Sequence, residues 1–403
     1  MTNQQEIVFR ESVEEIPSTT YATFGLYNYP AKFIPQIIAY ILQKYATSGM
    51  SVFDPFAGYG TVGIVSRVYG HDYELWDLNP MLEKLHEVAI MKLDKEVSVK
   101  TIIEDLKASK EDFTPDWENI EYWFPKEFLS LLSKAWGFYH FSNDDYVRKL
   151  LLIPLLKATR TFSFNDNQRQ KLSKSPLSQE RVEKLLSNDW KRMFYDSIET
   201  DLNKLIIKLK QYEELKPKNV KSIVKGGVDV MNSDLTRKHD ILVTSPPYLQ
   251  AQEYIRNSKM DLFWLGYSAA QIKNLGNKEI PYADAEAIPI YSRTYQEYRD
   301  MIAEPDLLKM YDRYFFGVLG ALTRFSKSIT DSMFLFVGSA NVRNKSVPIH
   351  QIFTEHFKEL GWEHQITLVD TIVSKRLFSY EVNPATGKAD SRMSKEYMVV
   401  LKK

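Results

Sequence analysis

The chain has 403 residues, which is enough for one large α/β domain with an insertion or for two domains. Its 44% apolar and 26% charged residues are typical of a folded globular protein and exclude a disordered chain. The 52 basic residues balance the 52 acidic ones, so any nucleic-acid surface must be local. The absence of cysteine excludes disulfides, thiolate zinc sites and every mechanism with a cysteine nucleophile.

The N-terminal stretch is polar and acidic, and no run approaches the roughly 18 to 20 apolar residues that cross a bilayer. We therefore expect a cytoplasmic protein that does not contact membranes. The seven histidines are scattered. The closest group, His350, His356 and His364, lacks the spacing of a helical metal pair, so no metal site is predicted.

The first elements predict the start of a doubly wound α/β sheet. Residues 33–46 place apolar side chains at helical spacing, and residues 51–53 read as a short buried strand that ends in Asp54. The segment DPFAGYGT (54–61) follows, then a helix over 62–70 and a second strand, YELWD (73–77). A strand, a glycine turn, a helix and a strand in this order are the opening of such a sheet.

From about residue 81 to 215 the pattern changes to long amphipathic helices, which predicts a mainly helical insertion. Strand patterns return at 221–229, 239–244, 332–340, 364–372 and 396–402. With the first two strands this makes about seven, enough for a Rossmann-like doubly wound sheet. We expect a sheet domain formed by residues 1–80 and 216–403, interrupted by the helical residues 81–215.

The glycine turn predicts a ligand site. Gly58 and Gly60 lack side chains, so the backbone there can approach a ligand closely. Asp77 ends the next strand, where an acid can accept hydrogen bonds from both ribose hydroxyls of an adenosine-like ligand. No Gly-Lys-Ser/Thr follows, which excludes a P-loop. A structural turn, a dinucleotide site and an S-adenosylmethionine site remain, and Asp54 favours the last because it can pair with an ammonium group.

A second turn decides between these interpretations. In DILVTSPPYLQAQEY, Ser245, Pro246, Pro247 and Tyr248 directly follow a buried strand, at the sheet edge where doubly wound proteins bind ligands. Two adjacent prolines stiffen the turn and fix the direction of the side chains around them. Alone, such a turn is more often a plain stiff loop. Beside DPFAGYGT it is better explained as half of an active site.

Together the two turns resemble the amino-methyltransferase family of DNA-modifying enzymes, in which D-P-F-x-G-x-G-T binds S-adenosylmethionine and (S/D/N)-P-P-Y binds the target amine. The serine form is similar to the branch that methylates N4 of cytosine. The segment YNYPAKFIP (27–35) matches the one that wraps the methionine end of the cofactor in that family. The stretch after 381 also has matches. Enzymes that methylate carbon 5 of cytosine are excluded, because they attack with a cysteine.

The chemistry of amine methylation explains these residue types. The lone pair of an exocyclic amine is delocalised into the base, and the Ser245 hydroxyl and the Pro246 carbonyl can free it by each accepting an amino hydrogen. Tyr248 would stack on a base that has been flipped out of the duplex. The expected catalytic residues are Ser245, Pro246, Pro247 and Tyr248.

The resemblance also assigns the cofactor contacts. It implies that Asp77 binds the ribose and that Asp229 in GGVDV lies near the adenine amino group. The expected cofactor-binding residues are Phe33, Pro35, Asp54, Pro55, Phe56, Gly58, Gly60, Thr61, Asp77, Asp229 and Ser245.

DNA contacts are expected in the insertion, because residues 157–192 hold nine lysines and arginines against four acids. A solvated surface is the alternative explanation for this excess. The candidate DNA-binding residues are Arg160, Arg169, Lys171 and Lys174, with Arg376 and Lys388 in a C-terminal loop.

The sequence therefore predicts a DNA methyltransferase specific for cytosine N4, with double-stranded DNA as its partner and a cognate restriction endonuclease as a further candidate partner. Adenine N6 is the first alternative, since the same acceptors serve either amine, and an RNA amine is more distant. A non-catalytic DNA-binding protein with this fold is the second class of alternative. The order of the motifs does not assign a subclass, because Ser245 follows Asp54 by 191 positions.

Overall fold

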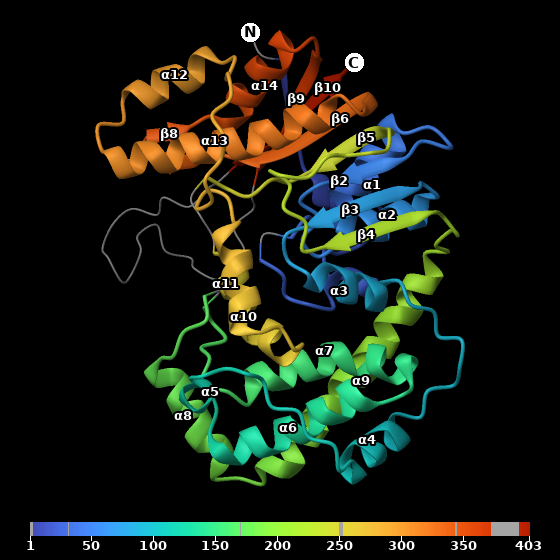
Figure 1. Ribbon diagram of the computed structural model, residues 1–403. Helices are drawn as coiled ribbons and strands as arrows, with labels where there is room; N and C mark the ends of the chain where they lie inside the picture. The colour runs from blue at the N-terminus through green and yellow to red at the C-terminus, as the bar shows by residue number, and fades with distance from the viewer. Residues whose placement is uncertain (1–2, 31, 170, 250–252, 343–344, 372–394) are drawn as a thin grey trace.

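The computed structural model describes residues 3–30, 32–169, 171–249, 253–342, 345–371 and 395–403. Its centre is an eight-stranded sheet with the order β1-β9-β10-β6-β5-β2-β3-β4 (Figure 1). The strands are β1 (Gln4–Ile7), β2 (Val52–Asp54), β3 (Tyr73–Asp77), β4 (Ser222–Gly226), β5 (His239–Thr244), β6 (Ile329–Gly338), β9 (Glu363–Thr371) and β10 (Lys395–Lys402). A separate hairpin pairs β7 (Ala340–Val342) with β8 (Lys345–Val347).

The strand order reverses between β2 and β5. Strands β4, β3, β2, β5 and β6 run parallel, and β10 lies antiparallel between β6 and β9. The chain runs outward from β2 through β3 to β4 on one side, and through β5 to β6 on the other. Such a reversal opens a crevice at the carboxyl ends of the central strands, where doubly wound proteins bind ligands. The predicted fold class, a Rossmann-like doubly wound sheet, is confirmed.

The eighth strand was not predicted. Strand β1 pairs in parallel with β9 at the edge of the sheet, and its residues are almost all exposed. A short edge strand with no buried face lacks the apolar alternation by which strands are found in a sequence.

Helices cover both faces of the sheet. Alternate residues of β5 divide between them: Ile241 and Val243 pack with the helices of one face and Leu242 with those of the other. The first face carries α1 (Pro35–Tyr45), α2 (Thr61–Tyr69) and α3 (Met81–Ala89). The second carries α13 (Pro305–Ser326) and α14 (Ile349–Glu359), with α12 (Arg293–Asp300) beside them (Figure 1).

The described residues between β3 and β4 form helices and loops only. Beyond α3 these helices lie together below the sheet in Figure 1, and the 25-residue α9 returns the chain toward β4. They are α4 (Val99–Ala108), α5 (Ile120–Trp123), α6 (Lys126–Phe141), α7 (Asp145–Thr161), α8 (Pro176–Leu186) and α9 (Trp190–Glu214). Two helices that follow β5, α10 (Tyr254–Trp264) and α11 (Ala269–Asn277), lie between the sheet and this group. None of the described helices is long and apolar enough to cross a membrane.

Candidate active site

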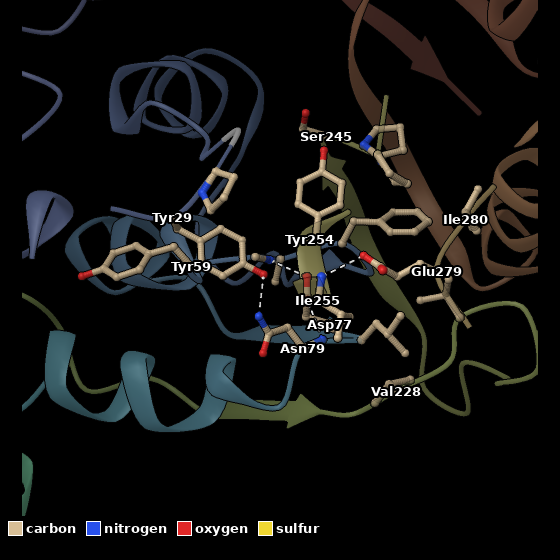
Figure 2. Close-up of a pocket in the computed structure, with 18 of the residues that line it drawn as sticks. Tyr29, Tyr59, Asp77, Asn79, Val228, Ser245, Tyr254, Ile255, Glu279 and Ile280 are labelled. Atoms are coloured by element: carbon tan, nitrogen blue, oxygen red, sulfur yellow. Dashed lines mark hydrogen bonds between the residues drawn. The ribbon is translucent and has the colours of Figure 1, made fainter. Parts of the chain in front are cut away.

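The two predicted turns meet at one pocket. Strands β2, β3 and β5 are neighbours in the sheet and end at Asp54, Asp77 and Thr244. Residues that follow all three strand ends line a cavity with about 900 Å³ of empty space, part of it open to solvent (Figure 2).

Asp54 is buried at the end of β2, shortly before residues that line the pocket, and only one of its two carboxylate oxygens has hydrogen-bond donors within the described part of the chain. The Phe56 backbone N–H and the Thr244 hydroxyl both donate to Oδ1, at 3.0 and 2.7 Å. Its Oδ2 is buried and has no hydrogen-bond partner among the described residues. Burial raises the pKa of Asp54 to about 7. A buried oxygen without a donor is costly, so a ligand that brings a cationic donor would be bound well here.

Both glycines of the first turn have positive φ, 54° at Gly58 and 85° at Gly60. A Cβ on Gly58 would lie 3.1 Å from the Tyr29 ring, and one on Gly60 would lie 2.8 Å from Nδ1 of His86. At Gly60 the space that a Cβ would take is filled by the buried His86 of α3, so the missing side chain at this position has a packing reason as well. Gly60 is required by helix packing and by its backbone conformation.

Asp77 holds the glycine turn in place. The Gly58 backbone N–H donates to Oδ2 and the Asn79 backbone N–H to Oδ1, both at 2.7 Å. Burial raises the pKa of Asp77 to about 6. Each carboxylate oxygen has a second lone pair, so Asp77 can still accept two hydroxyl groups from a ligand in the pocket that it lines.

The second turn brings a polar group and an aromatic ring to the same pocket. Ser245 is half-buried, Pro246 is buried, and the Tyr248 hydroxyl donates to Oε1 of Glu396 on β10 at 2.8 Å. Tyr254, the first residue of α10, lies between Ser245 and Asp77 in the view of Figure 2. The pocket is thus walled by aromatic rings with a few acceptors among them.

Sequence reasoning missed Glu279, which lines the pocket after α11. Its side chain is buried, and its Oε1 accepts the Ile255 backbone N–H at 2.9 Å (Figure 2). Burial raises the pKa of Glu279 to about 7. No motif or periodicity marks this acid in the sequence, since only the tertiary fold brings it to the pocket.

Nine of the predicted site residues line the pocket and five do not. Those that line it are Phe33, Phe56, Gly58, Asp77, Asp229, Ser245, Pro246, Pro247 and Tyr248. Those outside the lining are Pro35, Asp54, Pro55, Gly60 and Thr61. Pro35 and Thr61 begin α1 and α2, so they position the pocket rather than face it.

A second, larger cleft adjoins the pocket and reaches the helical insertion. It holds about 2180 Å³ of empty space, and its lining includes Lys157, Arg160 and Arg169. Six residues line both cavities: Tyr29, Pro30, Lys32, Phe33, Ser245 and Tyr248. Ser245 and Tyr248 therefore lie at the boundary between the two cavities.

Arg160, one of the predicted DNA contacts, is engaged inside the protein. Its Nη2 lies 2.5 Å from Oδ2 of Asp261 on α10 and donates to the Asn257 carbonyl at 2.8 Å. The Tyr27 hydroxyl donates to the same Asp261 oxygen at 2.5 Å. The fully buried Asp261 thus ties α7, α10 and the N-terminal segment together.

Three of the other predicted DNA contacts, Arg169, Lys171 and Lys174, lie on or near the surface. Lys171 pairs with Glu253 at 2.8 Å, and the Lys174 ammonium lies 3.8 Å from the centre of the Phe164 ring. Arg169 pairs with Asp166 at 3.3 Å. Arg376 and Lys388 lie outside the described residues. In the part of the chain that the structure describes, no three acids or histidines cluster as metal ligands would.

The chain is similar in sequence to known methyltransferases. No family model matches the chain. The type II methyltransferase M.MvaI of Kocuria varians is 22% identical over 428 residues, covering 96% of this chain and 92% of that protein. The chain resembles a methyltransferase along almost its whole length. M.MjaII, a type II methyltransferase of Methanocaldococcus jannaschii, is 31% identical over 110 residues, covering 27% of this chain and 20% of that protein.

Among solved structures, the rRNA methyltransferase AviRa of Streptomyces viridochromogenes aligns over 98% of this chain and 96% of its own, at 10% identity and a TM-score of 0.34. The sequence similarity to methyltransferases supports methyl transfer as the general activity of this chain, and methyl transfer requires a methyl donor.

Proposed function

We propose that the protein is a site-specific DNA methyltransferase that transfers a methyl group from S-adenosylmethionine to the N4 amine of a flipped-out cytosine. The observation that carries the proposal is that Asp77 and Ser245, from the two sequence motifs, line one pocket, and that Ser245 also lines the adjoining cleft that reaches the insertion. The full-length similarity to a type II methyltransferase agrees with it. Such an enzyme can act beside a cognate restriction endonuclease.

The residues present fit S-adenosylmethionine. The unpartnered Oδ2 of Asp54 suits the ammonium of the methionine portion, and Asp77 retains lone pairs for the ribose hydroxyls. Asp229 lines the same pocket, where it would accept from the adenine amine. Phe56 and Ile280 provide apolar lining for a purine. When bound, S-adenosylmethionine supplies a methyl group activated by a sulfonium.

The second turn would prepare the acceptor amine. The Ser245 hydroxyl and the Pro246 carbonyl accept one amino hydrogen each, so the nitrogen lone pair is released from the ring and the developing positive charge is stabilised. Tyr248 stacks on the face of the base, which must leave the duplex to reach the pocket. The position of Ser245 and Tyr248 between the two cavities suits a base that enters from the cleft.

The insertion would hold the DNA. The cleft lining carries Arg10, Lys32, Lys157, Arg160 and Arg169 but only Asp201 and Glu396 as acids, an excess that suits a phosphate backbone. Because Arg160 is tied to Asp261, it would shape this wall rather than read bases.

The decisive experiment is sequencing that detects modified bases in DNA from cells that express the protein. We expect N4-methylcytosine at one short recognition sequence, and none when Ser245 is replaced by alanine. N6-methyladenine as the sole product would replace cytosine by adenine in the proposal. Unmodified DNA together with intact cofactor binding would favour the non-catalytic DNA-binding alternative.

Cofactor binding is expected to strengthen as pH rises from about 5 to 8. The raised pKa values of Asp54 and Glu279, both about 7, and of Asp77, about 6, mean that these acids are partly protonated in the free protein at pH 6. A cationic ligand prefers the carboxylates, so its binding should release protons. Calorimetry in buffers of different ionisation enthalpy measures this release.

The same acids make an opposite contribution to folding. A carboxyl whose pKa is raised in the folded state stabilises the fold at low pH and loses that contribution as pH rises through its folded pKa. The unfolding free energy of the free protein should therefore receive a falling contribution from Asp54 between about pH 4 and 7. For cofactor binding, an affinity that does not change between about pH 5 and 8 would contradict the contacts assigned to these acids.

Replacing Lys171 and Lys174 by alanine is expected to reduce the salt dependence of DNA binding. Each phosphate contact contributes about 0.9 to the slope of log affinity against log salt concentration, so the double variant should lose nearly two units. Fluorescence anisotropy with labelled duplex DNA measures the slope. Lys100→Ala, on the exposed side of α4, is the matched control. An unaltered slope would place the DNA elsewhere.

A further inference from the structure

The contact between Tyr248 and Glu396 crosses a strand of the sheet. Tyr248 follows β5, whereas Glu396 belongs to β10, and β6 lies between these strands. Their side chains nevertheless meet at 2.8 Å between the Tyr248 hydroxyl and Oε1 of Glu396. Strands are about 4.8 Å apart, so a contact over two spacings needs long side chains from both partners.

The strand between them leaves room for the contact. The residue opposite Glu396 on β6 is Gly338, and residues directly opposite in an antiparallel pair project to the same face. Gly338 has no side chain, so no side chain at this position separates Glu396 from the turn formed by residues 245–248. On the other neighbour, β9, Asp370 lies opposite Glu396 and near Arg10, whose Nη1 is 3.8 Å from Asp370 Oδ2.

The contact anchors the far end of an aromatic ring. A tyrosine rotates about two side-chain bonds, and a hydrogen bond at its hydroxyl selects one rotamer. Glu396 and Tyr248 both line the large cleft, and Tyr248 also lines the small pocket. The anchored ring therefore stands where the two cavities join, with its orientation set from outside the turn.

We propose that Glu396 is a positioning residue of the active site, which fixes the Tyr248 ring for stacking on the target base. The inference rests on the proposed function, because it takes Tyr248 as the stacking residue. Glu396 acts through the tyrosine hydroxyl and does not touch the base. A rigid ring is ready to receive the flipped base, whereas a free ring must first be ordered.

The test compares Glu396→Leu, Glu396→Gln and Tyr248→Phe, each alone, with the double variant Glu396→Leu/Tyr248→Phe. The substrate is duplex DNA that carries the target site found by modified-base sequencing. A hydrogen bond to a charged group is worth roughly tenfold or more, so Glu396→Leu should lower kcat/KM about tenfold. Glu396→Gln keeps an acceptor and should remain within about threefold of the wild type.

The double variant distinguishes positioning from a general loss of structure. If Glu396 acts only through the hydroxyl, Tyr248→Phe already removes its effect, so the double variant should be no worse than Tyr248→Phe alone. The affinity for S-adenosylmethionine should be unchanged throughout. Glu363→Leu, the same change at an exposed position of β9, is the matched control. If Glu396→Leu does not fold, the comparison of Tyr248→Phe with Glu396→Gln still tests the inference, because one removes the hydroxyl and the other keeps an acceptor for it.

A spectroscopic readout addresses the ring itself. With 2-aminopurine at the target position, stacking on Tyr248 quenches its fluorescence, so Glu396→Leu should give a brighter complex than Glu396→Gln. Two results would overturn the inference, provided that the wild type methylates DNA. One is full activity of Glu396→Leu. The other is a double variant whose activity is lower than that of Tyr248→Phe by the same factor that Glu396→Leu alone costs. A wild-type protein that binds the cofactor and transfers no methyl to DNA would instead overturn the proposed function, and the inference with it.

Discussion

Replacing Asp77 by alanine is expected to lower the affinity for S-adenosylmethionine by about a hundredfold or more. The variant would lose two charge-assisted hydrogen bonds to the ribose, each worth about 1.5 to 3 kcal/mol. It would also release the Gly58 and Asn79 backbone groups that the carboxylate holds at 2.7 Å. Isothermal calorimetry with the cofactor measures the loss directly.

Two controls separate binding from folding. Asp77→Asn keeps an acceptor for one backbone group and should fall between the wild type and Asp77→Ala. Asp105→Ala changes an exposed acid on α4 and should leave the affinity unaltered. An Asp77→Ala protein that unfolds at the wild-type temperature and still binds the cofactor normally would remove Asp77 from the site.

Ser245→Ala is expected to slow methyl transfer by about a hundredfold to a thousandfold, the usual effect of losing one group that stabilises charge in a transition state. The hydroxyl would accept an amino hydrogen most strongly as positive charge develops on the nitrogen, so the loss should fall on kcat rather than on KM. Single-turnover transfer from labelled cofactor to DNA with a known target site measures the rate.

The conservative variant Ser245→Asn provides the comparison. Its amide carbonyl supplies an acceptor near the position of the hydroxyl, and asparagine occurs at this place in the motif that the turn resembles. We expect Ser245→Asn to retain more of the rate than Ser245→Ala. Equal rates for the wild type and Ser245→Ala would mean that the amine is held by other groups.

The central strands and both turns could be predicted because their signals are local. Buried runs such as 241–243, the glycines of the first turn and the double proline of the second each express a physical requirement within a few residues. The parallel order of β2, β3 and β5 then brings Asp54, Asp77 and Ser245 to one edge. Adjacency along a sheet follows from its topology, and the motifs were enough to predict a doubly wound sheet, although not its strand order.

Contacts between distant elements could not be predicted. Glu279 and Glu396 reach the site from a loop and from the last strand, and no sequence pattern marked either side chain as part of the site. For a related reason, counting charges in the sequence cannot reveal that Arg160 pairs with Asp261, because this partner is 101 positions away. Gly60 belongs to a turn that the sequence predicted, but the sequence could not reveal that a side chain at this position would collide with His86.

The carboxylate of Asp261 limits how much of residues 81–215, the proposed DNA-recognition region, can be exchanged for another sequence. A chimera that replaces residues 81–215 and omits an arginine at position 160 would leave a buried acid without its cation, a change that commonly costs several kcal/mol. The Tyr27 hydroxyl donates to the same acid, so the N-terminal segment that lines the cleft would then depend on a carboxylate that has lost its arginine. Grafts should therefore retain the end of α7 and begin beyond it, so that a new specificity is added to an intact anchor.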